Sequence, residues 1–463
     1  MTETDRILAR IAQGAAQSLS LEEILARYLE EWLLSPVRRE MLTGQQYYCN
    51  DNDIRRHRRL SIGPDGQLVE DKTLPCRQIS HGFVRKLVDQ KSQYLFGRPF
   101  TVSAADPAFA SLLGEMFDRQ LRDRMKNICK EAVNKGIAWL QVWPEDGGLQ
   151  FRRIPAEEVV PIWADGEHTR LEGLLHFYQM DSYEGRHRET VCRVEYWDSE
   201  KVRFYTWHQG RLEPDPFCPD KPHLTLNGQP VQLPFLPFVA FKYNEEELPL
   251  IRFVKPLVDD YDLLKSEDSS NLTDTSGAIM VLRNYDGTDL GEFRQNLSRF
   301  RAVKVSDGGG LEIRENPVHT AAVLSHLAQD RKDIYEIGRG VDTQTERLGQ
   351  ASGVAMKFLY ADLDLDCSGI ESQFAAGFDQ LIRLAALYYA LMGRGDFTGQ
   401  EAQIIINRDI IISEEDAIDG CVQSAGLLSR RTILENHPWI TDAGREMERL
   451  AAEGVSEQKE GGI

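Results

Sequence analysis

The sequence predicts an α+β protein with several domains. Apolar residues recur at helical spacing in both halves of the chain and alternate from 137 to 241, and a short segment of predicted strands with one helix lies between two longer predicted helices. The chain has 463 residues, of which 41% are hydrophobic and 27% charged. A chain of this length can bury a large core but exceeds what one core usually supports, so we expect about two to four domains.

Composition disfavours several classes of protein. No apolar run approaches the roughly 18 residues of a membrane span, and the first residues lack the pattern of a signal peptide, so we expect an intracellular protein. The seven scattered cysteines form no CxxC pair, which favours reduced thiols over disulfides or a zinc site. The formal net charge of −19 opposes tight nucleic-acid binding, so any contact with DNA must tolerate repulsion.

The N-terminal third is predicted to begin with helices. Apolar spacing indicates one helix over Leu21 to Leu34 and another over Phe83 to Leu95, which Gly97 and Pro99 end. A further helical pattern runs from Phe109 to Glu131.

Strands are predicted where the apolar period changes to two. The segments Ile137 to Trp143 and Leu149 to Ile154 flank a glycine-bearing loop and indicate a hairpin. Further strands are expected at Val194 to Trp197, Val202 to Trp207 and Phe238 to Phe241.

A compact insertion separates two helices of the second half. Leu257, Tyr261 and Leu264 lie on one ribbon of the first helix, and the second runs from about Ala321 to Ile337. The insertion is predicted to contain, in order, a strand (Ala278 to Leu282), a turn, a helix (Leu290 to Phe300), a strand (Ala302 to Val305), a glycine turn and a strand (Leu311 to Arg314).

A loop and an unusually long helix are predicted next. Gly338 and Gly340 break the preceding helix, a polar loop spans Val341 to Gln350, and the pattern stays helical from Ser352 to about Met392. A continuous helix of roughly 40 residues would be about 60 Å long, which suggests that it crosses a large assembly or packs against other copies. A strand at Ile404 to Ile406, a short helix and a disordered Glu- and Gly-rich tail are expected after it.

Several segments resemble the portal proteins of long-tailed Bacillus phages. Their order and spacing carry the resemblance, which covers nearly the whole chain. The segments are Ile79 to Pro99, including Tyr94-Leu95-Phe96-Gly97-Arg98-Pro99; Pro256-Leu257-Val258-Asp259-Asp260-Tyr261-Asp262 followed by Ser266-Glu267-Asp268; Ser352-Gly353-Val354-Ala355-Met356-Lys357-Phe358; and Leu428-Ser429 with Thr432.

The resemblance implies the phage portal fold, with a wing, stem, clip and crown, in a homo-oligomeric ring that typically has twelve subunits. The corresponding segments are 1–250 for the wing, 251–272 and 317–340 for the two stem helices, 273–316 for the clip, 341–351 for a tunnel loop facing DNA, 352–393 for the long wing-to-crown helix, and 394–463 for the crown and C-terminal tail.

The implied function is mechanical. Such a ring occupies one capsid vertex, forms the channel for packaging and ejection of double-stranded DNA, docks terminase and the head-tail adaptor, and meets the major capsid and scaffolding proteins. ATP hydrolysis would belong to terminase, so we expect a protein that is not an enzyme and needs no cofactor or metal. The resemblance also implies a location in the virion after assembly in the host bacterial cytoplasm.

Two sets of residues are expected to carry this function. The DNA-channel set is Asp342, Thr343, Gln344, Thr345, Glu346, Arg347 and Gln350. The partner-binding set of the clip is Arg283, Arg294, Arg299, Arg301 and Lys304.

Other patterns have alternative interpretations. Asp362, Asp364 and Asp366 alternate like the start of a calcium loop, but the glycine and glutamate of such a loop are out of place, so a solvated acidic face of a helix is favoured over a metal site. The basic run Arg55 to Arg59 favours a solvated loop, with contact to DNA or acidic capsid partners as the alternative. The glycines from Gly338 to Gly353 match neither phosphate-binding motif and favour hinges.

Two rival functions remain open at this point. One is a metal-dependent DNA-processing enzyme that uses the three aspartates, and the other is a minor capsid or scaffolding protein. The state in solution separates them, because only a portal forms large rings with an axial hole.

Overall fold

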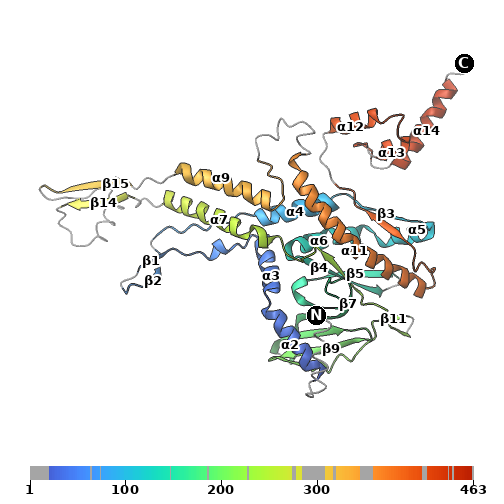
Figure 1. Cartoon of the computed structure of the whole chain (residues 1–463), viewed down its shortest axis with the longest axis horizontal. Coiled ribbons are helices and arrows are strands. Elements are labelled where there is room, and N and C mark those ends of the chain that lie inside the picture. Colours follow the sequence, from blue (N-terminus) through green and yellow to red (C-terminus); the bar gives the residue numbers. More distant parts are fainter. Residues whose placement is uncertain are drawn as a thin grey trace. The chain divides into compact units, whose positions relative to one another are not determined.

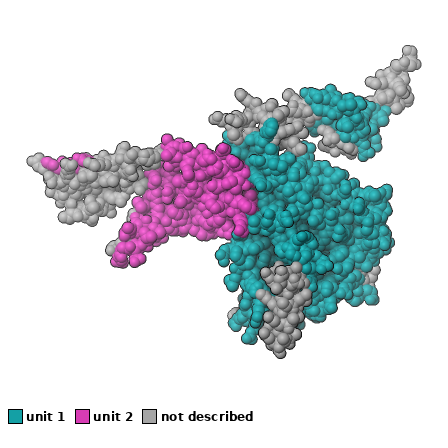
Figure 2. All heavy atoms as spheres, viewed as in Figure 1, with its two compact units in different colours: residues 1–41, 87–249, 339–463 teal, residues 42–86, 250–338 magenta. Residues whose placement is uncertain are grey.

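The computed structural model describes residues 20–62, 65–72, 74–145, 148–184, 187–226, 229–273, 278–283, 308–315, 320–344, 358–408, 414–435, 437–440 and 443–460 (Figure 1). The chain divides into two compact units, coloured separately in Figure 2. Unit 1 comprises residues 1–41, 87–249 and 339–463, and unit 2 comprises residues 42–86 and 250–338. Both units contain helices and strands, which confirms the predicted α+β class.

Unit 1 holds most of the strands. Its helices are α2 (Leu21–Leu34), α5 (Pro107–Met116), α6 (Arg119–Lys135), η2 (Ala156–Glu158), α11 (Ala361–Leu391), α12 (Glu414–Gln423), α13 (Arg430–Glu435) and α14 (Ala443–Glu460), while α3 (Pro36–Tyr48) and α4 (Phe83–Phe96) have residues in both units. Its strands are β3 (Thr101–Ala104), β4 (Ile137–Glu145), β5 (Gly148–Ile154), β6 (Val159–Trp163), β7 (Leu171–Glu184), β8 (His187–Trp197), β9 (Val202–His208), β10 (Arg211–Pro214), β11 (Leu224–Leu226), β12 (Gln229–Val231), β13 (Phe238–Lys242) and β16 (Ala402–Ile405).

Helix α2 covers one part of a five-stranded antiparallel sheet with the order β10-β9-β8-β7-β6. A capping box starts the helix, because the Ser20 hydroxyl accepts from the Glu23 amide and the Glu23 carboxylate accepts from the Ser20 amide. Its buried side chains Leu25 and Leu29 join a core cluster with residues of all five strands. The amphipathic pattern predicted for this helix is therefore confirmed.

A three-stranded sheet with the order β13-β4-β5 contains the predicted hairpin of β4 and β5. Trp139 of β4 stacks on Trp163, and Trp197 meets Phe238 of β13 edge to face. These buried aromatic residues form a second core cluster that includes side chains of both sheets. Large aromatic side chains bury much apolar area, so this cluster stabilises the sheets against each other.

Helix α11 packs closely against β13. Phe374 and Phe378 of the helix contact Phe241 of the strand. A Cβ added to Gly377 would lie 2.6 Å from the Phe241 ring and 3.0 Å from the Ala240 carbonyl oxygen, so only glycine allows this approach.

Unit 2 consists mainly of two helices and two hairpins. Its elements are η1 (Asp53–Arg56), β1 (Leu60–Ile62), β2 (Leu68–Glu70), α7 (Ile251–Thr273), β14 (Ala278–Arg283), β15 (Gly310–Glu315) and α9 (Thr320–Ile337), besides its parts of α3 and α4. Helices α7 and α9 lie side by side in Figure 1. Phe83 contacts Tyr261 of α7 and Tyr335 of α9, with ring centroids 5.0 Å and 6.0 Å away, so one aromatic side chain contacts both helices.

Buried polar side chains of α7 bind an extended segment of unit 2. Asp262, which is fully buried, accepts from the His81 amide and ring and from the Asn52 side-chain amide. Ser266 and Ser270, each one turn further along the helix, accept from the amides of Ile79 and Arg77. The spacing of four residues places these acceptors on one face of α7, which explains why a row of small polar residues is buried there.

Four sequence-based predictions need correction. The pattern from Phe109 to Glu131 forms two helices, because the Asp118 carboxylate accepts from the Leu121 amide and starts α6 anew. No strand was predicted at β1, β2, β3, β6, β7, β10, β11 or β12, and no helix at α3. The helix predicted from Ser352 to Met392 is interrupted at Tyr360, which lies in a turn, and α11 then has 31 residues; residues 352–357 of the prediction lie outside the described residues. Helix α14 extends to Glu460, into the tail that was expected to be disordered.

Among the described residues, no helix combines the length and the apolar character that crossing a membrane requires.

Candidate functional site: the inserted hairpin and the anchored loop

The predicted insertion between α7 and α9 contains a hairpin. Strands β14 and β15 pair antiparallel from Ala278 opposite Glu315 to Arg283 opposite Gly310. The pairing brings Ala278 and Glu315, the two ends of the hairpin, opposite each other. The rest of the insertion lies between Arg283 and Gly310 in the sequence. The two outer strands of the predicted insertion are therefore confirmed.

The clip residues chosen from sequence are only partly covered by the structure. Arg283 is the last residue of β14. Arg294, Arg299, Arg301 and Lys304 lie outside the described residues, as do the predicted helix from Leu290 to Phe300 and the strand from Ala302 to Val305.

The start of the predicted tunnel loop is held by Gln90 of α4. The Val341 amide donates to Gln90 Oε1 at 3.1 Å, and Gln90 Nε2 donates to the Val341 carbonyl oxygen at 2.7 Å. One side-chain amide thus satisfies both backbone groups of Val341, which is 2% exposed. This double hydrogen bond fixes the backbone where the loop leaves the fold.

A buried charge cluster lies beside this attachment. Lys91 Nζ is 2.6 Å from Asp366 Oδ2 of α11 and donates to the Arg339 carbonyl oxygen at 3.1 Å. Asp366 also accepts from the Tyr243 hydroxyl at 3.0 Å and from Arg339 Nη1 at 3.3 Å. Burial and the neighbouring Asp366 raise the pKa of Tyr243, which keeps its hydroxyl protonated as a donor.

Arg339 adopts a backbone conformation that side-chain-bearing residues rarely use. Its φ is +46°, in the left-handed region. Its carbonyl oxygen and its guanidinium are both bound within the cluster of Lys91 and Asp366. These contacts hold a backbone conformation that would otherwise cost about 1 kcal/mol or more, and they fix the chain two residues before Val341.

Asp364, two residues before Asp366, is bound by a second set of partners. It accepts from the Tyr94 hydroxyl at 2.9 Å and from Arg408 Nη1 at 2.5 Å. Arg408 also binds Glu371 of α11 at 2.5 Å. The first turns of α11 are thereby tied to α4 and to the segment after β16.

These contacts correct the interpretation of the three alternating aspartates. Asp362 is exposed, as a solvated acidic face requires, but Asp366 is buried and Asp364 is half-buried. Both bound aspartates face cationic side chains rather than one another, so the three do not form a common metal site. The alternative of a metal-dependent DNA-processing enzyme relied on these three aspartates as metal ligands, and they do not form such a site.

Sequence reasoning missed Gln90, Lys91, Tyr243 and Arg408 as partners of this region. The alternating aspartates were a signal, but an acidic residue shows its partner in the sequence only when the two are neighbours along a helix or strand. Lys91 and Asp366 are 275 positions apart.

The predicted tunnel loop itself is described up to Gln344. Asp342 Oδ1 accepts from the Gln344 amide at 3.0 Å, which makes a local turn, and Thr343 and Gln344 are exposed. Thr345, Glu346, Arg347 and Gln350 lie outside the described residues.

The basic run from Arg55 to Arg59 has mostly local partners within unit 2. Arg56 binds Asp51 at 2.6 Å, Arg58 lies 3.5 Å from Glu70, and Arg59 donates to Asn271 at 2.7 Å. Arg55, Arg56 and Arg58 are nevertheless exposed, in agreement with the favoured interpretation of a solvated segment.

Comparisons with known proteins agree on one family. The family model described as "Phage portal protein, SPP1 Gp6-like" matches residues 37–460. The chain is 30% identical to the portal protein of Bacillus phage SPP1 over 423 residues, covering 89% of this chain and 83% of that protein. It is also 30% identical to the portal protein of Clostridium phage phiCD119 over 447 residues, covering 90% and 92%.

Two solved structures share a weaker likeness. They are described as "Virion of native gene transfer agent (GTA) particle" and "Neck of native GTA particle computed with C12 symmetry", with TM-scores of 0.38 and 0.39. Each is 11% identical and covers 76% of this chain and 88% of the other.

The sequence family therefore defines the class of protein as a phage portal protein, a structural component of the virion. Within that class, the chain belongs to the SPP1 Gp6-like phage portal family. The resemblance stated from its sequence segments is confirmed.

Proposed function

We propose that this portal protein assembles with further copies of itself into a closed ring at one capsid vertex, and that double-stranded DNA passes through the ring during packaging and ejection. A ring of twelve subunits is the size that the family resemblance implies. The wing, stem, clip, tunnel loop and crown keep the boundaries predicted from the sequence.

Exposed apolar side chains on α7 and α9 are the observation that carries the proposal of a ring. In the single chain, Phe253 and Leu272 of α7 are 47% and 71% exposed, and Leu324 and Ile337 of α9 are 54% and 50% exposed. Two helices that pack mainly on each other leave such side chains in water unless another surface covers them. If α7 and α9 of each subunit packed against the adjacent subunit, a closed ring would cover these side chains in every subunit.

The anchored loop supports a role in the channel. Gln90 and Lys91 hold its start, so the loop leaves the fold from a fixed position. Its residues are polar, and its single arginine, Arg347, lies near Asp342 and Glu346 in the sequence. Such a loop contacts phosphate weakly and without reading bases, which allows DNA to slide.

The charge of the chain supports transport rather than tight binding. A formal net charge of −19 per subunit, repeated around a ring, repels the DNA backbone. Repulsion spread evenly around a channel leaves no deep electrostatic minimum along the path of the DNA.

Replacement of Arg347 by Glu tests the channel assignment. The change reverses one charge in each subunit, so we expect weaker retention of packaged DNA while rings still form. Arg347→Lys keeps the charge and serves as the matched control. Unchanged retention in Arg347→Glu particles would show that another segment lines the channel.

We assign the docking of terminase, and later of the head-tail adaptor, to the insertion between α7 and α9. The paired strands β14 and β15 close its base, so the residues between them can be removed without breaking either helix. A chain in which residues 284–309, between the two strands, are replaced by a short linker should lose terminase binding. The same replacement of the β1–β2 hairpin is the control, and full terminase affinity without the insertion would refute the assignment.

The proposed position of the ring at a capsid vertex also implies its remaining partners. The major capsid and scaffolding proteins would surround the ring, and assembly would take place in the host bacterial cytoplasm before the ring becomes part of the virion. Co-purification of the ring with capsid and scaffolding proteins from infected cells tests this part of the proposal. A minor capsid protein would associate with the capsid without forming a channel.

A further inference from the structure

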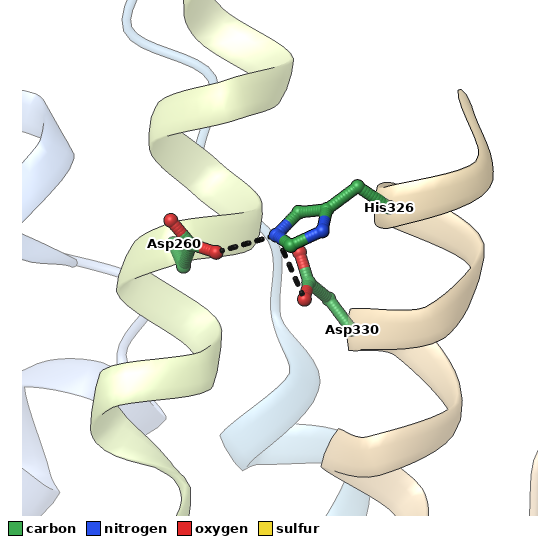
Figure 3. Close-up of side chains that lie close together, drawn as sticks. All are labelled: Asp260, His326 and Asp330. Carbon is green, nitrogen blue, oxygen red and sulfur yellow. Dashed lines mark hydrogen bonds and ion pairs between the residues drawn. The ribbon is translucent and has the colours of Figure 1, made fainter. Parts of the chain in front are cut away.

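Three potential metal ligands meet where α7 and α9 pack together. Asp260 comes from α7, and His326 and Asp330 come from α9 (Figure 3). His326 Nε2 lies 3.1 Å from Asp260 Oδ2 and 3.6 Å from Asp330 Oδ1. One ligand atom from each residue lies within 4.8 Å of the other two.

The local sequence explains how the three side chains converge. His326 and Asp330 are four residues apart on α9, so they lie on one face of the helix in successive turns. The same face carries Leu327 and Ile334, which are buried in unit 2. Helix α7 contacts α9 and brings Asp260 to the imidazole from the other side (Figure 3).

The two distances from His326 match those between ligands of one small dication. Two atoms bound to Zn²⁺ at about 2.0–2.2 Å with a tetrahedral angle lie about 3.4 Å apart. The observed 3.1 Å and 3.6 Å fall on either side of this value. The side chains of His326 and Asp260 are 56% and 47% exposed, so an ion can reach them from solvent and keep water in its remaining positions.

One oxygen of the Asp330 carboxylate has no hydrogen-bond partner among the described residues. Asp330 is 5% exposed, and its Oδ2 is buried with no hydrogen-bond partner among the described residues. A proton on His326 Nε2 can be donated to Asp260 or to Asp330, but this leaves the second oxygen of Asp330 without a partner. A buried carboxylate oxygen without a partner is costly, and a bound dication would supply that partner.

The charges around the cluster also favour a cation. Asp333 lies one turn from Asp330 on α9 and adds to the negative potential at its carboxylate. The neighbouring Arg331 lies over the rings of Phe83 and Tyr335.

We propose that Asp260, His326 and Asp330 bind one divalent transition-metal ion, such as Zn²⁺, which links α7 to α9 in each subunit. An imidazole nitrogen beside two carboxylate oxygens favours Zn²⁺ over Mg²⁺ or Ca²⁺, which prefer oxygen ligands alone. The ion has a structural role, because it fixes the relative position of the two helices that lead into and out of the insertion.

Isothermal titration of the full-length chain with Zn²⁺ tests this site. We expect one ion per subunit, and we expect His326→Gln and Asp330→Asn each to weaken binding by at least about tenfold, equal to about 1.4 kcal/mol. Addition of Zn²⁺ should raise the Tm of the original chain but not of these variants, because a ligand of the native state stabilises it. His326→Gln changes a half-exposed side chain and so keeps the fold if Asp330→Asn does not.

Two control variants separate coordination from general charge attraction. Asp333→Asn removes a nearby negative charge, and His208→Ala removes an exposed histidine of unit 1. His208→Ala should bind Zn²⁺ with nearly the original affinity, and Asp333→Asn should lose much less affinity than His326→Gln or Asp330→Asn. With Co²⁺ as probe, the visible absorption of an imidazole-bound ion should appear in the original chain and disappear in His326→Gln.

Three results would overturn the proposal. The first is no Zn²⁺ binding, which would leave the cluster as a proton-linked contact between the helices. The second is equal Zn²⁺ affinity in the original chain and in His326→Gln. The third is displacement of Zn²⁺ by an equal concentration of Mg²⁺, which would exclude the imidazole as a ligand.

Discussion

Lys91 Nζ lies 2.6 Å from Asp366 Oδ2, and the Lys91 side chain is fully buried. The pair joins α4 to α11 beside the turn from which the predicted tunnel loop departs. Burial of two charges is costly, but the hydroxyl of Tyr243 and the guanidinium of Arg339 complete the hydrogen bonds of Asp366. The pair should therefore be sensitive to loss of either partner.

Lys91→Met should lower the free energy of unfolding by about 3 kcal/mol or more, because it leaves Asp366 buried without its main cation. Urea unfolding of the unassembled subunit measures the effect. Lys201→Met is the control, since Lys201 and Asp220 form an exposed pair whose loss should cost less than about 1 kcal/mol. Equal effects of the two substitutions would contradict a stabilising role for the buried pair.

The double variant Lys91→Met with Asp366→Leu should recover much of the lost stability. Removal of both charges abolishes the penalty for an unpaired buried carboxylate, and apolar side chains of similar size fill the space. The comparison of the two single variants and the double variant gives the coupling energy directly. Additive losses would show that Lys91 and Asp366 act independently.

Gln90 offers a graded test of the loop attachment. Gln90→Glu can still accept from the Val341 amide but cannot donate to its carbonyl oxygen, and Gln90→Leu can do neither. Hydrogen exchange at the Val341 amide should therefore be slowest in the original chain and fastest in Gln90→Leu, with Gln90→Glu between them. Equal exchange rates in all three would show that Gln90 does not hold the loop.

The buried pair of His176 and Glu195 predicts a pH dependence of stability. His176 of β7 lies opposite Glu195 of β8, with Nδ1 3.6 Å from Oε2. Burial lowers the pKa of His176, but Glu158 and Glu195 raise it more, so its pKa lies above its ordinary 6.5. Burial raises the pKa of Glu195, but His176, Tyr178 and Trp197 lower it more, so its pKa lies below its ordinary 4.5.

The sign of the effect follows from these directions. The contribution of His176 is fully present below pH 6.5 and is lost as the pH rises through its raised pKa. The contribution of Glu195 is present above pH 4.5 and is lost as the pH falls through its lowered pKa. The Tm difference between the original chain and His176→Gln should thus be largest between pH 4.5 and 6.5 and shrink at higher pH. A difference that grows towards alkaline pH would contradict the pairing.

Leu324→Glu tests the proposed contact between subunits. Leu324 is 54% exposed, so a charge there should change the stability of the single subunit by no more than about 0.5 kcal/mol. In a ring, the same charge would be buried between copies and should shift the population from rings to monomers, as sedimentation velocity can show. Phe217→Glu, at a residue 94% exposed in unit 1, is the control and should assemble normally. Normal assembly of Leu324→Glu would place the interface elsewhere.

The sequence predicted those elements whose pattern is local. The helices α2, α4, α7 and α9 were recognised because one apolar stripe or a glycine-proline stop marks each of them. The hairpin of β4 and β5 was recognised from its alternating strands and glycine-bearing turn. Strand β7 was missed because its residues beyond Phe177 are largely polar, and their pairing with β8 makes them a strand.

The site was harder to predict because its partners are distant in the sequence. Asp366 belongs to an acidic pattern that favours a solvated face, and only the fold brings Lys91 and Tyr243 to it. The pairing of β3 with β16 likewise joins Thr101 to Ile405. The cluster of Asp260, His326 and Asp330 depends on the packing of α7 against α9, so the four-residue spacing on α9 was not a sufficient signal.

The central claim is that this portal protein forms a closed ring, and the mass of the assembled protein tests it most directly. Native mass spectrometry of the purified full-length chain, together with negative-stain images of the same sample, measures both subunit number and shape. We predict one species of about twelve subunits, the size that the family resemblance implies, which appears as rings with an axial hole. A folded monomer as the only species at micromolar concentration would contradict the claim.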